Sequence, residues 1–407
     1  MNPTIEPADN REPAVRKTGK ASIGSRLHVL TLTPFFPSVG DEVSGCFIAE
    51  PLAQLAPLGI ESSVMATTPM HYARKAPSPV ASAEWVRYAQ MPGNFGLSSA
   101  GKFLYASLLG RVRKLHGVKP IDVIHAHAAL PCGHAAALLS RKLKIPFVVT
   151  VHGLDVFNTC FLGGIPAGWR RQVSVAVYGA ARNVICISGK VQEILKCGTP
   201  TETRSTVVHN GTDPALFSPS PIESEPHEPE VLMVGNLQRA KGHELVLQAI
   251  ARLSPIFPAL RCRVIGDGPD RARFESLARE LGIAQRVQFA GRLGRAGVAE
   301  AMRECSVFVL PSRNEGLGCV YLEAMSSGKP VLACRGQGID EVIEHGKNGW
   351  LIPVDSLEEL VAGLTVLLGS SEVRTRMGAE ARQTILNKLT LSHQAEQLAA
   401  IYRQAVV

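Results

Sequence analysis

VFVLPSRNEGLGCVYLEAMSSGKPV, residues 307–331, joins a strand, a glycine-bearing loop and a helix within one short stretch. The apolar run 307–310 is typical of a buried parallel strand, because such strands are covered on both faces. Residues 319–327 predict a helix, and the Gly-Lys-Pro sequence that follows ends it. The loop 315–318 then lies at the carboxyl end of a strand and at a helix N-terminus. Open α/β sheets bind anionic or phosphorylated ligands at such positions.

Two acidic residues of this stretch, Glu315 and Glu323, are eight positions apart. Glu315 falls in the loop and Glu323 about one turn inside the helix, since an α-helix turns once every ~3.6 residues. Both can therefore face one pocket at the end of the strand. The alternative is that they are ordinary solvated acids, which the helix dipole favours near an N-terminus. The apolar neighbours of Glu323 instead indicate a buried carboxylate, which needs a partner.

NEGLGCVYLEAMSSGKPV resembles the E-x7-E signature of retaining GT-B glycosyltransferases, in particular the large family 4. The resemblance implies that Glu315 contacts the donor sugar and that Glu323 binds the ribose hydroxyls of the nucleotide. It also implies that Gly316, Leu317 and Gly318 belong to the donor site.

The composition predicts a soluble α/β protein of two domains, because 407 residues are long for a single core. No apolar run reaches the ~18 residues of a transmembrane helix. The nine cysteines are scattered and form no C-x-x-C pair, which indicates buried thiols in a reducing cytoplasm. The twelve histidines show no metal-ligand spacing, so no metal is expected.

The charge is uneven along the chain. Residues 1–218 carry 22 Lys+Arg and 13 Asp+Glu, a net charge of +9, and residues 219–407 carry 21 and 22, a net charge of −1. A basic half predicts an anionic partner, either a membrane surface at the inner face of the plasma membrane or a lipid-phosphate acceptor. A merely solvated basic surface is the alternative. Nucleic acid is not expected, because no binding motif is present.

The first domain is predicted to span residues 26–217, after a disordered tail over residues 1–25. A strand at 27–32, a glycine-bearing loop, a helix at 47–58 and a second strand make a βαβ unit. Gly45 in the loop matches the second of the glycine pair that lies near the donor phosphate in the resembled family. The alternative is a turn glycine before the helix.

A second strand end in this domain carries a polar cluster. The strand at 146–151 ends in His152-Gly153-Leu154-Asp155, where α/β enzymes place chemistry. His152 could hydrogen-bond a sugar hydroxyl, and the alternative is a capping or core-edge histidine. The HGLD sequence resembles the family pattern, which implies that His152 contacts the donor sugar. The earlier pair in His125-Ala126-His127 is expected to follow a strand and to belong to the fold.

The second domain, residues 218–390, restarts the pattern with a strand at 230–234, the loop GNLQRAKG and a helix at 243–253. Gly235 lets the backbone approach a diphosphate, the helix N-terminus offers N–H groups, and Lys241 supplies positive charge. The loop resembles the family motif G-R-L-x-x-x-K-G. Asn236 replaces the arginine of that motif, and Arg239 is the candidate to compensate. A solvated helix-start lysine is the alternative for Lys241.

Further donor contacts follow from the resemblance. Gly266 ends a strand at 260–265, and Arg292 and Leu293 lie in a loop whose backbone contacts the base in the family. A helix is expected from residue 298 and a hairpin-like element at 348–352. The last helix, 391–407, is expected to return to the first domain.

The resemblance covers about residues 27–400 and implies a GT-B fold, with two Rossmann-like doubly wound parallel-sheet domains facing across a cleft. It implies retaining transfer from a UDP- or GDP-sugar to a glycan or lipid-linked acceptor in cell-envelope or exopolysaccharide biosynthesis. No cofactor is expected. The alternatives are a GT-B-type UDP-sugar 2-epimerase and a non-catalytic nucleotide-sugar-binding protein. An NAD-dependent enzyme is disfavoured, because no G-x-G-x-x-G follows a strand.

Overall fold

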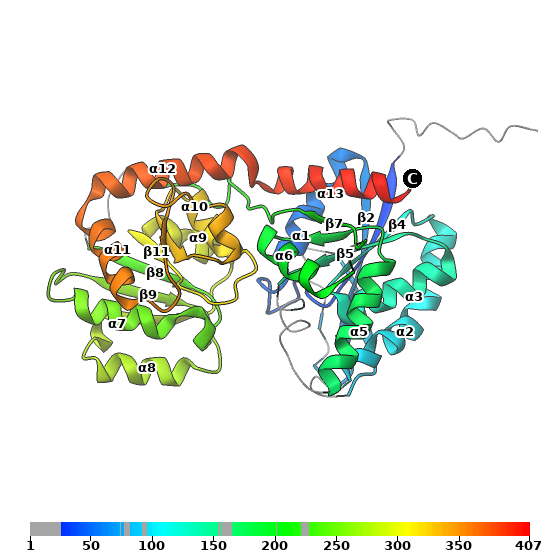
Figure 1. Ribbon diagram of the computed structural model, residues 1–407, viewed down its shortest axis with the longest axis horizontal. Helices are drawn as coiled ribbons and strands as arrows, with labels where there is room; N and C mark the ends of the chain where they lie inside the picture. The colour runs from blue at the N-terminus through cyan, green and yellow to red at the C-terminus, as the bar shows by residue number, and fades with distance from the viewer. Residues whose placement is uncertain are drawn as a thin grey trace, which may run out of the picture.

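The computed structural model contains two α/β domains, each built on one parallel sheet (Figure 1). The described residues are 26–73, 75–76, 82–91, 96–153, 155, 165–200, 202–220 and 228–407. The tail predicted over residues 1–25 lies outside them, as does Leu154 of the HGLD sequence.

The first sheet has seven parallel strands in the order β3-β2-β1-β4-β5-β6-β7. The strands are β1 Leu27–Thr33, β2 Ile60–Pro69, β3 Glu84–Tyr88, β4 Val123–His127, β5 Phe147–Val151, β6 Val184–Cys186 and β7 Ser205–Val207. The helices are α1 Cys46–Ala53, α2 Leu97–Val118, α3 His134–Leu143, α5 Ile165–Ala180 and α6 Gly189–Gly198. Short helical turns cover Ala56–Leu58 and Ala129–Gly133.

The second sheet has six parallel strands in the order β10-β9-β8-β11-β12-β13. The strands are β8 Glu230–Val234, β9 Arg261–Ile265, β10 Val287–Gly291, β11 Val307–Val309, β12 Val331–Cys334 and β13 Trp350–Ile352. The helices are α7 His243–Leu253, α8 Arg271–Glu280, α9 Arg295–Glu304, α10 Cys319–Ser326, α11 Leu357–Gly369 and α12 Ser371–Lys388. Single turns cover Arg239–Lys241, Ala284–Arg286 and Gly338–Glu341.

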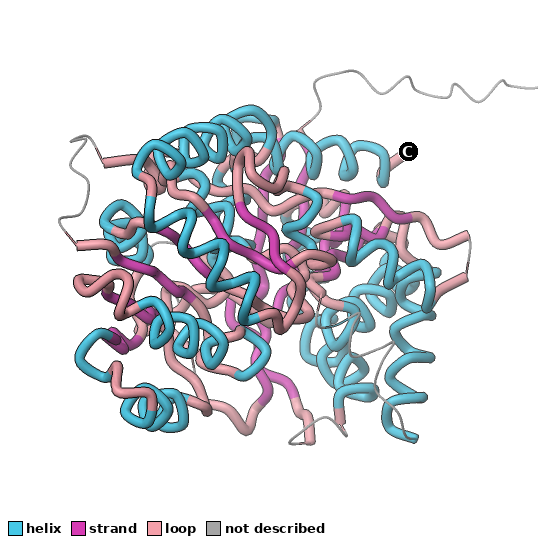
Figure 2. The backbone as a smooth tube through the Cα atoms, turned by 60° about the vertical axis from the view of Figure 1, so that its left-hand side comes forward, coloured by secondary structure: helices cyan, strands magenta, loops and turns pink. Residues whose placement is uncertain are grey.

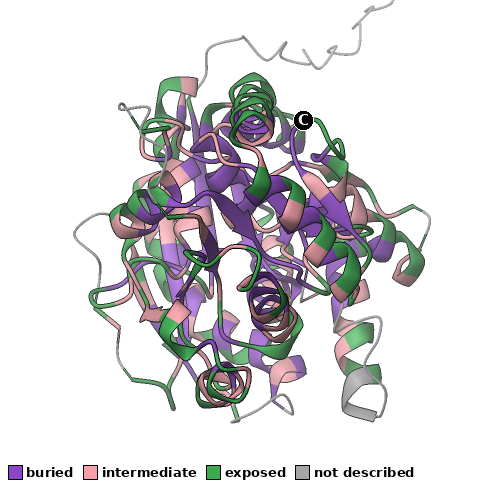
Figure 3. Cartoon of the chain, turned by 90° about the vertical axis from the view of Figure 1, so that its left-hand side faces the viewer, coloured by how far each residue is buried: buried purple, intermediate pink, exposed green. Residues whose placement is uncertain are grey.

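Both sheets reverse their strand order at one point, between β1 and β4 in the first and between β8 and β11 in the second. Loops diverge at such a switch point and leave a crevice at the carboxyl ends of the strands. Helices cover both faces of each sheet (Figure 2). Burial concentrates in the strands and in the inner faces of the helices, whereas the outer faces of the helices are exposed (Figure 3). The sheets therefore form the cores, and their loops are free to carry a site.

Three expectations from the sequence are wrong. The element at 348–352 is no hairpin, because β13 pairs in parallel with β12 and buries Leu351 and Ile352 at the sheet edge. Helix α9 begins at Arg295, three residues before the expected start. The histidines of His125-Ala126-His127 lie inside β4 rather than after it, where parallel pairing with β5 buries them.

The last helix, α13 Leu391–Ala405, leaves the second domain and packs on the first (Figure 1). Its buried side chains, including Leu398 and Ile401, join a cluster with Val29 of β1 and Val148 of β5. None of the helices that the structure describes combines the length and apolar composition that a bilayer crossing requires.

An ion-pair cluster joins the two domains beside α13. Arg295 of α9 donates hydrogen bonds to both carboxylate oxygens of Glu50 in α1, each at 2.8 Å. The same guanidinium donates to Glu323 of α10 and lies 4.7 Å above the ring of Phe217. The side chain of Glu323 is almost fully buried, at 5% exposed, and that of Arg295 is partly buried, at 17% exposed. One arginine thus neutralises a carboxylate from each domain.

Replacing Arg295 by alanine should therefore lower stability. Glu323 would remain buried without its partner, and breaking a buried pair from one side costs about 3–5 kcal/mol. A thermal melt should show a clearly lower transition temperature for Arg295→Ala. Exposed Arg292, three residues earlier, provides the control, and Arg292→Ala should change stability by less than about 0.5 kcal/mol. Equal melting of the two variants would contradict the role given to this cluster.

Candidate active site

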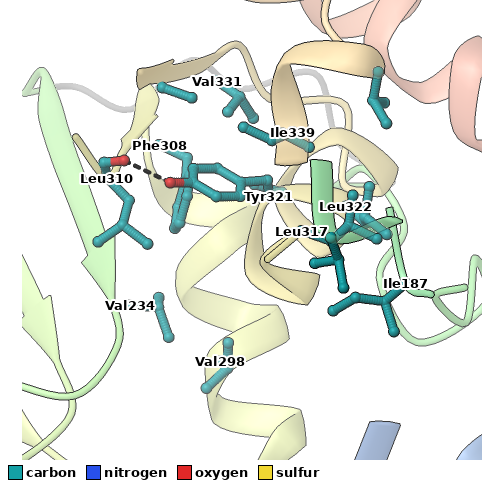
Figure 4. Close-up of a cluster of buried hydrophobic side chains, with 14 of the residues drawn as sticks. Ile187, Val234, Val298, Phe308, Leu310, Leu317, Tyr321, Leu322, Val331 and Ile339 are labelled. Carbon is teal, nitrogen blue, oxygen red and sulfur yellow. Dashed lines mark hydrogen bonds between the residues drawn. The ribbon is translucent and has the colours of Figure 1, made fainter. Parts of the chain in front are cut away.

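The loop between β11 and α10 is held by its own residues. Asn314 and Gly318 adopt left-handed backbone conformations, with φ of 55° and 79°. Tyr321, at the start of α10, donates a hydrogen bond of 2.7 Å from its hydroxyl to the carbonyl of Leu310 (Figure 4). A Cβ on Gly318 would lie 2.5 Å from the Tyr321 ring. The hydrogen bond from Tyr321 to Leu310 therefore connects the two ends of the loop.

Lys241 and Glu315 meet at the carboxyl ends of neighbouring strands. Lys241 follows β8 and Glu315 follows β11, and these strands pair in parallel. The Nζ atom of Lys241 lies 2.5 Å from Oε2 of Glu315, and Ser312 donates to the same oxygen at 2.9 Å. Both side chains are only partly covered, 25% exposed for the lysine and 14% for the glutamate. The structure thus brings together the cation and the carboxylate that the sequence singled out.

The backbone clamps these two loops to each other. The amide of Arg313 donates to the carbonyl of Ala240 at 2.7 Å. Gly242 has φ of 75°, and a Cβ there would lie 2.4 Å from the carbonyl oxygen of Pro311. Only glycine fits that contact, so the lysine loop is seated directly against the glutamate loop.

The tip of the glutamate loop reaches the first domain at Gly316. Ser188, the N-cap of α6, donates to the carbonyl of Gly316 at 2.5 Å. A Cβ on Gly316 would lie 2.9 Å from the carbonyl oxygen of His152, and one on Gly338 would lie 1.7 Å from the carbonyl oxygen of Gly316. Glu315 is held there as well, because its amide donates to the side-chain oxygen of Gln337 at 2.9 Å. The backbone of His152 is therefore adjacent to the loop of Glu315.

His152 lies one residue past the end of β5, and its ring packs against the rings of two phenylalanines. The ring centroids of Phe47 and Phe35 are 5.0 and 6.4 Å from that of His152. Burial lowers the pKa of His152 to about 4, so the ring is uncharged near neutral pH. Its Nε2 lies 3.0 Å from Nδ1 of His127. A cavity beside it is lined by Phe47, His125, His127, His152 and Tyr402, among others.

Glu323 is not grouped with Glu315. It is 4% exposed on α10 and pairs with Arg295, whereas Glu315 pairs with Lys241. The expected buried carboxylate with a partner is present, but the partner is a guanidinium. A ribose hydroxyl would share this carboxylate with Arg295.

The glycines predicted at the donor site occupy tight positions. Gly266 has φ of 137°, and a Cβ there would lie 1.9 Å from the carbonyl oxygen of Gly235. The backbones at the ends of β8 and β9 are therefore in close contact, with the side chain of Leu237 beside them. Gly45 has φ of 82° and precedes α1, and a Cβ there would lie 2.5 Å from the backbone of Phe35. Each of these positions excludes a side chain, as a phosphate-binding backbone requires.

The other predicted contacts differ in accessibility. Asn236, Arg239 and Arg292 are exposed, and Leu293 is partly buried against the core. The backbone amide of Arg239 donates to Asp270 at 3.0 Å. The side chain of Leu317 is fully buried near Leu322 and Ile187 (Figure 4). Leu317 could therefore contact a donor only through its main chain, because its position in the core holds the side chain away.

Arg295 and Glu50 were not predicted from the sequence, and His127 was expected to have only a structural role. One feature of the sequence indicates an acidic partner for Arg295. The helix dipole disfavours a cation in the first turn of a helix, so a nearby carboxylate is expected to compensate. Nothing local pointed to Glu50, which is 245 residues away in the chain.

The arrangement offers a cation and backbone amides for an anionic group, and carboxylates and a neutral imidazole for hydroxyls. Within the part of the chain that the structure describes, no three His, Cys, Asp or Glu residues gather as a metal site would require.

Comparisons with known proteins agree with this geometry. Residues 218–384 match the family model described as glycosyl transferases group 1, and residues 47–216 match that of glycosyltransferase family 4. An uncharacterized glycosyltransferase of Methanocaldococcus jannaschii is 30% identical over 265 residues, which are 65% of this chain and 70% of that protein. The alpha-D-kanosaminyltransferase of Streptomyces kanamyceticus is 28% identical over 338 residues, 78% of this chain and 86% of that protein.

The fold has solved counterparts. The structure of Anabaena HepE in complex with UDP-glucose superposes with a TM-score of 0.72 at 20% identity, covering 92% of this chain and 98% of that one. Two parallel-sheet domains with this strand order, together with the matched families, confirm the GT-B fold. The chain belongs to glycosyltransferase family 4, and it is a glycosyltransferase of the GT-B fold.

Proposed function

We propose that this enzyme transfers a sugar from a UDP- or GDP-sugar to an acceptor hydroxyl, with retention of the anomeric configuration. The observation that carries the proposal is the contact between Lys241 and Glu315, 2.5 Å apart at the carboxyl ends of β8 and β11. In this proposal Lys241 would stabilise a leaving phosphate, and Glu315 beside it would bind a sugar hydroxyl. The complex of HepE with UDP-glucose supports a nucleotide-sugar donor, because that protein shares the fold.

The diphosphate would lie against the backbone at Gly235 and Gly266, where β8 and β9 end. A Cβ on Gly266 would lie 1.9 Å from the carbonyl oxygen of Gly235, so no residue larger than glycine fits at position 266. Helix α7, 11 residues long, begins just beyond and directs its N-terminal amides toward this edge. Lys241 would add a full positive charge at the leaving oxygen. Charge placed where the leaving group develops charge lowers the barrier in a site that excludes water.

The reaction breaks the bond between the anomeric carbon and the diphosphate oxygen, which leaves with the electron pair. The acceptor oxygen forms the new bond to the anomeric carbon from the same face. Its proton passes to the departing phosphate oxygen, so no covalent bond to the protein is needed. Lys241 stabilises the negative charge on the phosphate throughout.

The remaining predicted residues would hold the donor. Glu315 and His152 would bind hydroxyls of the sugar, and Glu323 the ribose. The close approach of Gly316 to the backbone of His152 supports these roles, because Glu315 and His152 lie on adjoining loops.

We also propose that the acceptor is a glycan or a lipid-linked glycan of the cell envelope, reached from an anionic membrane surface. The net charge of +9 in residues 1–218 supports this. Helix α2 exposes Lys102, Arg113 and Lys114, together with Phe103, which is 51% exposed. Basic side chains near an anionic surface each contribute about 1 kcal/mol of binding.

Lys241→Ala tests the reaction. Transfer from a panel of UDP- and GDP-sugars should fall by about 10²–10³-fold, the usual loss when one charge-stabilising group is removed. Nucleotide release and the anomeric configuration of the product are the readouts. Exposed Lys388 on α12 gives the matched control, and Lys388→Ala should retain full activity. Near-normal turnover by a folded Lys241→Ala enzyme would remove the lysine from the mechanism.

The same panel separates the alternatives. Conversion of a UDP-sugar to its epimer without any acceptor would indicate the 2-epimerase. Nucleotide binding without turnover against a broad acceptor panel would indicate a non-catalytic binding protein.

Sedimentation with vesicles tests the membrane surface. The protein should bind phosphatidylglycerol vesicles at low salt and lose that binding as salt rises, since screening weakens surface charge. Replacing Lys102, Arg113 and Lys114 by glutamine should abolish it. Phosphatidylcholine vesicles serve as the control, and no binding to anionic vesicles at low salt would contradict this surface.

A further inference from the structure

A hydrogen bond between two histidines lies directly behind the predicted sugar contact. His127 ends β4, and its register partner in β5 is Thr150, two residues before His152. The Nδ1 atom of His127 is 3.0 Å from Nε2 of His152, and the two rings are nearly parallel, at 19°. This contact uses one of the two ring nitrogens of His152 and leaves Nδ1 without a hydrogen-bond partner among the described residues.

Both rings are uncharged near neutral pH. Burial lowers the pKa of His127 well below its usual value, and His125 and His152 beside it lower that pKa further. A neutral imidazole carries a single N–H, so one ring must donate and the other must accept. Whichever nitrogen of His127 is protonated therefore decides which nitrogen of His152 is protonated.

His127 is itself held from behind. Its ring centroid is 4.3 Å from that of His125. The two nitrogens of His125 lie 2.7 Å from the hydroxyls of Tyr402 in α13 and Thr150 in β5. This stack fixes the position of the His127 ring, and through it that of His152.

The unpaired nitrogens favour one of the two arrangements. His127 Nε2 and His152 Nδ1 are buried and have no hydrogen-bond partner among the described residues. His127 is 6% exposed, whereas His152 is partly exposed. A buried N–H without a partner costs more than an unused acceptor, so the spare proton belongs on the histidine nearer the surface. His127 then donates through Nδ1, and His152 carries its proton on Nδ1.

We propose that His127 is a positioning residue that holds His152 as the Nδ1-protonated tautomer, so that His152 donates a hydrogen bond to an oxygen of the donor sugar. The inference rests on the proposed function only in that His152 meets the sugar. Its core, the protonation state of His152, can be measured on the free enzyme.

Nitrogen-15 NMR of the full-length enzyme tests this state. His152 is assigned by comparison with His152→Gln, and the spectrum should show its proton on Nδ1. In His127→Leu, which cannot donate, the signal should shift toward the Nε2-protonated form. A proton on Nε2 in the unmodified enzyme would overturn the proposal even if the leucine variant fails to fold. An unchanged His152 signal in a folded His127→Leu would overturn it as well.

Kinetics supply a second readout with a matched pair of variants. His127→Leu should lower kcat about fivefold and leave the Kd for UDP unchanged, because one orienting hydrogen bond is worth about 1 kcal/mol. His127→Asn keeps an N–H close to the position of Nδ1 and should restore most of kcat. Equal loss in both variants would show that volume rather than hydrogen bonding matters, which contradicts the proposal.

A shifted tautomer with unchanged transfer has a different meaning. It would support the control of His152 by His127 and remove His152 from sugar binding, so the proposed function would fail at that residue alone.

Discussion

The close approach of backbone at Gly316 is the constraint on which the rest of the site depends. A Cβ on Gly338 would lie 1.7 Å from the Gly316 carbonyl oxygen, and a Cβ on Gly316 itself would lie 2.9 Å from that of His152. The loop after β11 therefore lies between the turn at Gly338 in its own domain and the end of β5 in the other domain. Glu315 precedes this contact by one residue, so its backbone is held close to both domains. A single short loop thus brings Glu315 next to the strand end that carries His152.

Two groups of ion pairs lie near this loop, and they differ in what they connect. Lys241 and Glu315 remain partly accessible, as groups that meet a substrate must be. Glu50, Arg295 and Glu323 connect the domains, and Glu323 is the most deeply buried of them, with its side chain 5% exposed. Because Glu323 belongs to the connecting group and is also the expected ribose contact, a bound nucleotide and the contact between the domains would act on the same carboxylate.

Local patterns predicted the fold well. The strand at 230–234 and the helix at 243–253 were predicted to the residue, because an apolar run and a periodic stretch are bounded by glycines there. Lys241 and Glu315 stand in glycine-bearing loops after such strands, so their meeting follows from the strand order. The bond between Arg295 and Glu50 could not be predicted, since it joins residues far apart in the chain and depends on how the domains dock. The histidine stack was missed because β4 continues through His127, whereas both histidines were expected to follow the strand.

Calorimetric titration with UDP, GDP and ADP tests the proposed nucleotide site at the loop after β11. One of these nucleotides should bind with a 1:1 stoichiometry, and Glu323→Gln should weaken that binding at least tenfold. Glu300→Gln, at an exposed position of α9, should bind as the unmodified enzyme does. No binding of any of the three to the folded protein, or equal binding by Glu323→Gln, would contradict the donor site described here.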